Sequence, residues 1–186
     1  MGLFRRASRS TSGSAPGPAV PAEVVAALGM QRGERLLAPH ATSTRSGPGW
    51  LLATTYRLGL ASAAEGLVWL RPWHEVDQAS WQREARTLAI TFVDSSRVQQ
   101  YPLDDAAHFL QVFRERVQAS VVAAVDLSLT GPRKARAVIR ADLRTGDLLE
   151  QVVLGRGTRP SPEIDAVAAA VLVGLREEVG LPPARG

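Results

Sequence analysis

The fold of this chain is decided between Gly49 and Trp81, where the sequence reads GWLLATTYRLGLASAAEGLVWLRPWHEVDQASW. Three short apolar runs follow one another there, separated by turns and by a corner at Pro72 and Trp73. The segment also holds all four tryptophans of the chain. Short apolar runs bounded by turn residues are typical of antiparallel strands. The segment therefore predicts part of a small antiparallel β-barrel that serves for binding, and it contains no catalytic constellation.

Strand signals continue on both sides of this segment. The predicted strands are 35–41, 49–55, 58–61, 66–71, 76–82, 87–93 and 98–103. Their short length and regular spacing are typical of an all-β sandwich or barrel.

Helical patterns flank the strands. Pro21 to Met30 predicts a short helix, because Pro21 suits a first turn and the apolar residues share one face. The period changes at Asp104, which can cap a helix. Apolar residues then recur at helical spacing as far as Val125, so we expect a long helix that covers one open end of the barrel.

A separate section follows Val125. Lys134–Leu143 and Leu148–Leu154 predict a hairpin, and Ser161 opens a last helix as its cap, with proline in the first position. The sequence thus predicts an α+β chain with a basic leader at 1–20, a capped barrel at 21–125, and a hairpin-plus-helix appendage at 126–186.

Composition limits the function classes. The chain has 186 residues, of which 45% are hydrophobic, and no cysteine, which excludes disulfides and cysteine-based chemistry or zinc binding. It has neither an 18-residue apolar run nor the apolar part of a secretory signal, so we expect a cytoplasmic protein. Of the net charge of +4, three units come from Arg5, Arg6 and Arg9 in the leader, which leaves +1 for the rest. A nucleic-acid-binding body is therefore not expected.

The order of signals resembles the bacterial pleckstrin-homology-like and GRAM-like domains. In those families a glycine-led strand ends in a Thr-x-x-Arg-Leu turn, which is Thr54 to Leu58 here. The Pro72–Trp73 corner, the branched residue Val76 and a long helix after the last strand also follow the family pattern. The resemblance covers roughly residues 32–125 and implies a seven-stranded, strongly bent barrel closed by the helix.

The resemblance does not imply a ligand. Better-known members of the superfamily bind phosphoinositides through basic residues after the first strand, but that loop offers only His40 and Arg45 here. The cluster that would hold several phosphates is missing.

No residue set predicts catalysis or a cofactor. The histidines His40, His74 and His108 are far apart, without a partner at metal-ligand spacing. No serine lies in a nucleophile elbow. The glycine-rich stretch 155–161 could hold an anion before the last helix, but it lacks the Lys-Ser/Thr of a P-loop.

Three features are candidate contact surfaces. The first is a basic stripe on the hairpin, formed by Arg133, Lys134, Arg136 and Arg140. It could meet nucleic acid or an acidic partner, although a solvated sheet face explains it more simply. The second is Trp73, which would be exposed at its corner if it does not join the other tryptophans in the core. The third is the tail with Arg5, Arg6 and Arg9, which could touch an anionic membrane weakly.

The sequence therefore predicts a non-enzymatic module for protein interaction or scaffolding, with an unknown protein partner and no cofactor. The alternative is a peripheral membrane or lipid-binding module that uses the tail and the barrel mouth. Free sheet edges also leave open a homo-oligomer.

Overall fold

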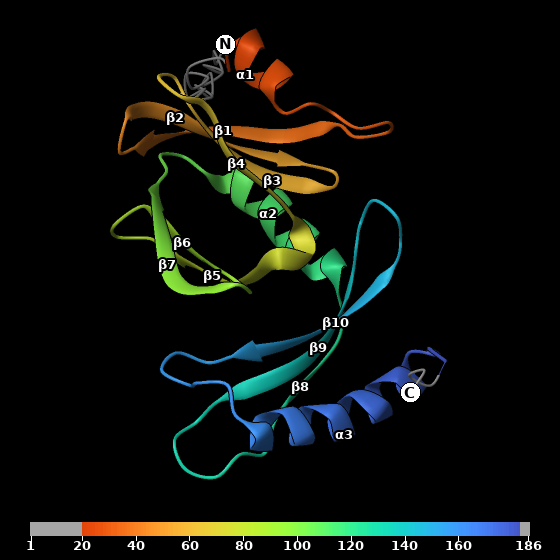
Figure 1. Cartoon of the computed structure of the whole chain (residues 1–186). Coiled ribbons are helices and arrows are strands. Elements are labelled where there is room, and N and C mark those ends of the chain that lie inside the picture. Colours follow the sequence, from red (N-terminus) through yellow and green to blue (C-terminus); the bar gives the residue numbers. More distant parts are fainter. Residues whose placement is uncertain (1–19, 183–186) are drawn as a thin grey trace, which may run out of the picture.

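The computed structural model describes residues 20–182, apart from the side chains of Ser95 and Ser96. Its first sheet contains four antiparallel strands in chain order, β1 (Leu36–Thr44), β2 (Gly47–Thr54), β3 (Arg57–Ser62) and β4 (Gly66–Pro72). The short helix α1 (Ala22–Ala27) lies on one face of this sheet (Figure 1). Residues of α1, β2 and β3 bury a small core there, which includes Val24, Leu28 and Trp50.

A 3-10 turn, η1 (Trp73–Glu75), leads from β4 into a second antiparallel sheet. This sheet is formed by β5 (Val76–Gln82), β6 (Thr87–Phe92) and β7 (Ser95–Pro102), also in chain order. The facing sides of the two sheets share one large core with α2 (Ala107–Ser120). Phe109, Val112 and Phe113 are the buried apolar residues of α2 in this core.

The predicted closed barrel is wrong. The seven strands lie in two separate sheets, and β1 and β7 are the outer strands at the side where closure would be needed. These two strands do approach each other, but Pro39 in β1 and Pro102 in β7 have no N–H to donate. A side-chain hydrogen bond connects the strands instead, since Thr42 Oγ1 donates to the Pro102 carbonyl at 2.9 Å.

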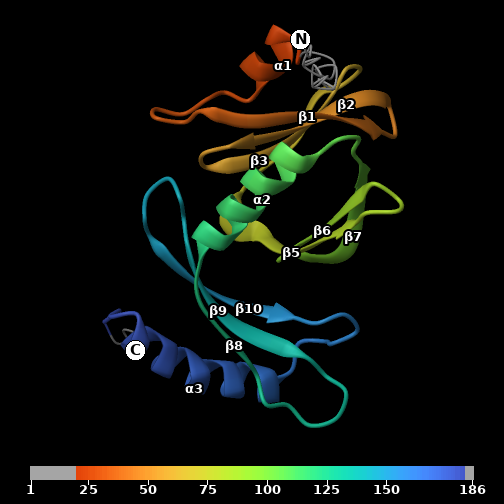
Figure 2. The same cartoon turned by 180° about the vertical axis from the view of Figure 1, so that it is seen from behind.

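The predicted long helix is also too long at both ends. It begins at Ala107 after an uncapped turn, so Asp104 is not its cap, and it ends at Ser120. Residues Val121–Asp126 form strand β8 directly after the helix (Figure 2). β-Branched residues lose side-chain freedom in a helix and fit a strand well, which favours β8 over a further helical turn.

The C-terminal part therefore contains three strands rather than a hairpin alone. Strands β8, β9 (Ala135–Ala141) and β10 (Leu148–Leu154) form an antiparallel sheet in the order β10-β9-β8. Helix α3 (Pro162–Glu178) covers one face, and Ser161 caps it by accepting a hydrogen bond from the Ile164 amide at 3.4 Å. The predicted hairpin and final helix are confirmed. We call residues 20–120 the N-terminal unit and residues 121–182 the C-terminal unit.

Candidate functional site

The two units meet at the face of the C-terminal sheet that α3 leaves uncovered. Side chains alternate along β9, so Ala135, Ala137 and Ile139 pack under α3 while Arg136 and Arg140 point to the other face. Arg136 forms an ion pair with the Asp77 carboxylate on β5. Gln151 on β10 donates from Nε2 to the His74 carbonyl at 3.1 Å. The junction therefore combines these polar contacts with an apolar one, since Leu143 packs against the large core of the N-terminal unit.

Arg140 lies at the centre of this junction and is only 2% exposed. Its Nη1 donates to Ser120 Oγ at 3.2 Å, whereas its Nε has no hydrogen-bond partner among the described residues. Burial, with a smaller contribution from the charge of Arg136, lowers the pKa of Arg140 to about 10. The guanidinium thus remains charged at neutral pH, and no described carboxylate neutralises it.

The four residues of the predicted basic stripe lie in different surroundings. Arg136 and Arg140 are used at the junction, and Arg133 pairs with Glu163 at 2.6 Å on the α3 side. Lys134 is exposed. The four side chains therefore do not form one continuous basic surface, because the sheet face that carries Arg136 and Arg140 packs against the N-terminal unit.

Trp73 is fully buried, so the prediction of an exposed contact at this corner is wrong. Its Nε1 donates to the Thr54 carbonyl at 3.0 Å, and its ring lies edge-on to Phe113, with 5.6 Å between centroids. The interpretation of the tryptophans as core residues is confirmed for Trp73 and Trp50, while Trp69 and Trp81 are partly buried. The predicted membrane tail, Arg5, Arg6 and Arg9, lies outside the described residues.

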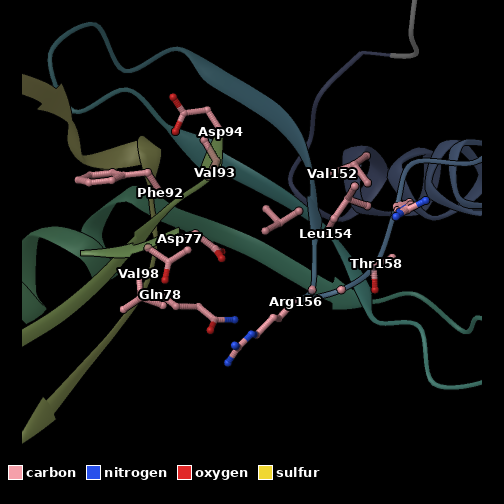
Figure 3. A pocket seen from close by; sticks show the side chains of 15 residues that line it. Asp77, Gln78, Phe92, Val93, Asp94, Val98, Val152, Leu154, Arg156 and Thr158 are labelled. Carbon is pink, nitrogen blue, oxygen red and sulfur yellow. The ribbon is translucent and has the colours of Figure 1, made fainter. Parts of the chain in front are cut away.

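An open cleft of about 590 Å³ lies beside the junction, between the second sheet and β10 with the segment that follows it. We call it the inter-unit cleft. Figure 3 shows Gln78 and Val98 on one wall, with Leu154 and Arg156 on the other. The remaining lining residues are Asp77, Thr91, Phe92, Val93, Asp94, Val152, Val153, Gly155, Gly157, Thr158 and Arg159.

The acidic side chains that line the inter-unit cleft are ion-paired, whereas two of its arginines are not paired with any described carboxylate. Its two carboxylates are both ion-paired, Asp77 with Arg136 and Asp94 with Arg71, the latter at 2.9 Å. Arg156 and Arg159 are exposed at the other end, and neither forms an ion pair with a carboxylate in the described part of the chain. Lys134 and Arg156 also line a smaller neighbouring hollow of about 280 Å³, which contains three basic residues, with Arg136, and one acidic residue, Asp126. This end therefore favours a negatively charged group.

The turn that carries Arg156 is held firmly. The Gly155 amide donates to the Lys134 carbonyl at 2.7 Å, and the Lys134 amide donates to Thr158 Oγ1 at 3.0 Å. A Cβ on Gly155 would lie 2.8 Å from that carbonyl, which explains the glycine. The amides of Gly155 and Thr158 are occupied by these internal bonds, so they cannot form the anion cradle considered from the sequence. The exposed side chains of Arg156 and Arg159 remain as groups that could bind an anion here.

A second cavity, of about 610 Å³, lies between the β1–β2 turn, β4 and β7. Arg45, Trp69 and Tyr101 are among its lining residues. Burial raises the pKa of Tyr101 to about 12, and its hydroxyl donates to Gln99 Oε1.

The sequence did not single out Gln78, Asp94 or Val98, because the cleft joins segments far apart in the chain. In the sequence, only the glycine-rich turn at 155–159 indicated a binding site in this cleft. Within residues 20–182, no group of three or more His, Asp or Glu side chains could hold a metal ion, and no helix has the length and apolarity to cross a membrane. A scan against protein-family models finds no matching model, and no curated protein matches the sequence.

Proposed function

We propose that this protein is a non-enzymatic interaction module that binds an extended, acidic segment of another protein in the inter-unit cleft. The observation that carries the proposal is the cleft itself, because one wall is the outer strand β10 and one end is basic. No chemical step is assigned, since both carboxylates that line the cleft are held by arginines.

Strand β10 supplies the backbone part of the proposed binding. It is the last strand of its sheet, and residues 152–154 line the cleft. An extended segment can add to such an edge through main-chain hydrogen bonds, while pockets select alternate side chains. Val98 and Val152, which are 47% and 39% exposed, offer apolar contact for those side chains.

Arg156 and Arg159 supply the charge selectivity. Arginine forms strong, often bidentate hydrogen bonds with carboxylates. Both residues follow β10 directly, so a segment paired with β10 would reach them at its end. The preferred segment therefore alternates apolar and acidic residues.

The resemblance to pleckstrin-homology-like domains supports this proposal only through the order of the strands and the helix. Seven antiparallel strands followed by a helix match the element order of those families, without the closed barrel. Domains of this kind serve as binding modules, which agrees with an interaction role.

Fluorescence anisotropy with labelled synthetic peptides tests the proposal. A peptide with alternating valine and glutamate should bind the full chain, and its valine–lysine counterpart should not. The double variant Arg156→Glu/Arg159→Glu should bind about tenfold more weakly, since it loses charge-assisted hydrogen bonds. The matched control is Arg32→Glu/Arg114→Glu, which makes the same charge change at exposed residues outside the cleft and should bind like the wild type.

Equal binding by both double variants would contradict the proposal. So would binding to anionic phosphatidylserine vesicles that is lost in the Arg156/Arg159 variant when no peptide binds, because the cleft would then recognise a membrane.

A further inference from the structure

Strand β8 has the sequence of a central strand but lies at the edge of its sheet. Its six residues read VVAAVD, a nearly continuous apolar run that is typical of strands covered on both faces. However, β8 pairs only with β9, and Val121, Val122 and Val125 are 38%, 44% and 40% exposed. Of its residues, only Ala123 packs against the core under α3.

Four of the other outer strands of the described sheets carry features that discourage pairing with another strand. Proline lies within or ends β1, β4 and β7, and Asp77 lies within β5, whereas β10 carries only Glu150, outside its cleft-lining residues 152–154. Proline and charge are the usual protections of a sheet edge. The first five positions of β8 have neither. An edge of this kind is a ready surface for another strand.

We propose that β8 pairs antiparallel with β8 of a second copy of this chain. A two-fold axis perpendicular to the sheet pairs only residues that share a face, so the axis would pass through Ala123 and place it opposite Ala123 of the second copy. Val122 would then lie opposite Ala124 of the second copy, and Val121 opposite Val125. Apolar residues thus meet apolar residues on both sides of the axis, and Asp126 remains at the outer end.

A second copy fits this edge better than a charged partner. Five uncharged residues offer no complement to a basic or acidic strand, whereas the register above matches the strand to itself. Arg136 on β9 and Gln151 on β10 make polar contacts with the N-terminal unit, and these contacts do not occupy the outer side of β8. The product would be a six-stranded sheet with both α3 helices on the same face, because the axis is perpendicular to the sheet.

The proposed dimer is weak. A contact of one six-residue edge is small beside the roughly 1,600 Å² of a standard interface. Association should therefore depend strongly on protein concentration. This inference is independent of the peptide-binding proposal, because β8 does not line the inter-unit cleft.

Sedimentation velocity of the full chain over a concentration series provides the first test. The wild type should shift from monomer to dimer as concentration rises, and Val122→Lys and Val125→Lys should remain monomeric. Val68→Lys is the matched control, since Val68 is 43% exposed on another outer strand, β4, and this variant should dimerise. A wild type that stays monomeric, or loss of the dimer in Val68→Lys alone, would overturn the proposal.

A spin label provides a second test that tolerates a poorly folding lysine variant. The chain has no cysteine, so Val122→Cys can carry a single label. Pulsed electron resonance should give a short distance between the two labels, because neighbouring strands lie about 5 Å apart. A dimer with a long distance at this site, but a short one for a label at Val68→Cys, would refute pairing through β8. The Arg156→Glu/Arg159→Glu variant should dimerise like the wild type.

Discussion

The two units of this molecule are built from different cores. The large core of the N-terminal unit is rich in aromatic side chains, with Trp73, Phe92, Phe109 and Phe113 among its buried members. The core under α3 contains only aliphatic residues, several of them alanine. Aromatic residues bury much more surface for each side chain ordered. We infer that the N-terminal unit provides most of the stability, and that the C-terminal unit depends on its junction.

The largest expected effect comes from removing the aromatic centre of the N-terminal unit. Trp73→Ala should lower the free energy of unfolding by about 4 kcal/mol, because it leaves a cavity and an unpaired Thr54 carbonyl. Urea denaturation measures the change. Trp81→Ala is the control, and should cost about 2 kcal/mol because Trp81 is only partly buried. Equal losses in the two variants would show that the core is not centred on Trp73.

The next effect concerns a buried ion pair within the N-terminal unit. Glu34 accepts hydrogen bonds from Thr54 Oγ1 at 2.6 Å and from Arg57 Nε and Nη2 at 2.9 and 2.5 Å. Burial alone would raise the pKa of Glu34, but the bonds from Arg57, Gln31 and Thr54 outweigh it and hold the pKa below its usual value. Glu34→Gln should cost about 2 kcal/mol, since it leaves Arg57 without its counter-charge.

This ion pair also predicts a pH dependence. A carboxylate whose pKa is lower in the folded state stabilises the protein above its unfolded pKa, and this contribution disappears as the pH falls through the folded value. The wild-type unfolding midpoint should therefore drop more steeply below about pH 4.5 than that of Glu34→Gln, which lacks the titrating group. Parallel midpoint curves for the two proteins would contradict the lowered pKa.

The smallest effect concerns the junction and has the opposite sign. Arg140→Met keeps the length of the side chain but removes a buried charge that has no carboxylate partner. It should raise the free energy of unfolding by about 1 kcal/mol and slow amide exchange in β9 and η1. Arg133→Met, at a partly exposed ion pair, should change stability by less than about 1 kcal/mol. A strong loss of stability in Arg140→Met would show that the charge holds the units together.

Local patterns predicted those parts of the fold that local forces determine. Ser161 and Pro162 predicted the start of α3, and the turn 144–147 predicted the hairpin. Val121 and Val125 satisfied a helical period and a strand equally well, and the pairing with β9 decided between them. Closure of the barrel failed for a similar reason, because it depends on how two distant strands meet.

The candidate site was harder to predict from the sequence than the helices and strands. The alternation along β9 predicts that Arg136 and Arg140 share a face, but a solvated face and a face covered by another sheet give the same pattern. The paired acid, Asp77, lies 59 positions from Arg136. Only long-range packing brings such groups together, and no local periodicity records it.

The passage from α2 into β8 contains no linker residue, since the helix ends at Ser120 and the strand begins at Val121. A loop would have allowed the C-terminal unit to swing freely, but here its orientation is set by the backbone angles of one or two residues. Ser120 Oγ fixes that point further, because it donates to the Val117 carbonyl at 2.7 Å and accepts from Arg140. The orientation of the C-terminal unit thus depends on the backbone at Ser120 and Val121. Insertions in the β9–β10 turn would leave the orientation of the C-terminal unit unchanged. A single residue added after Ser120 would instead move the side chains of β8 to the opposite face of its sheet.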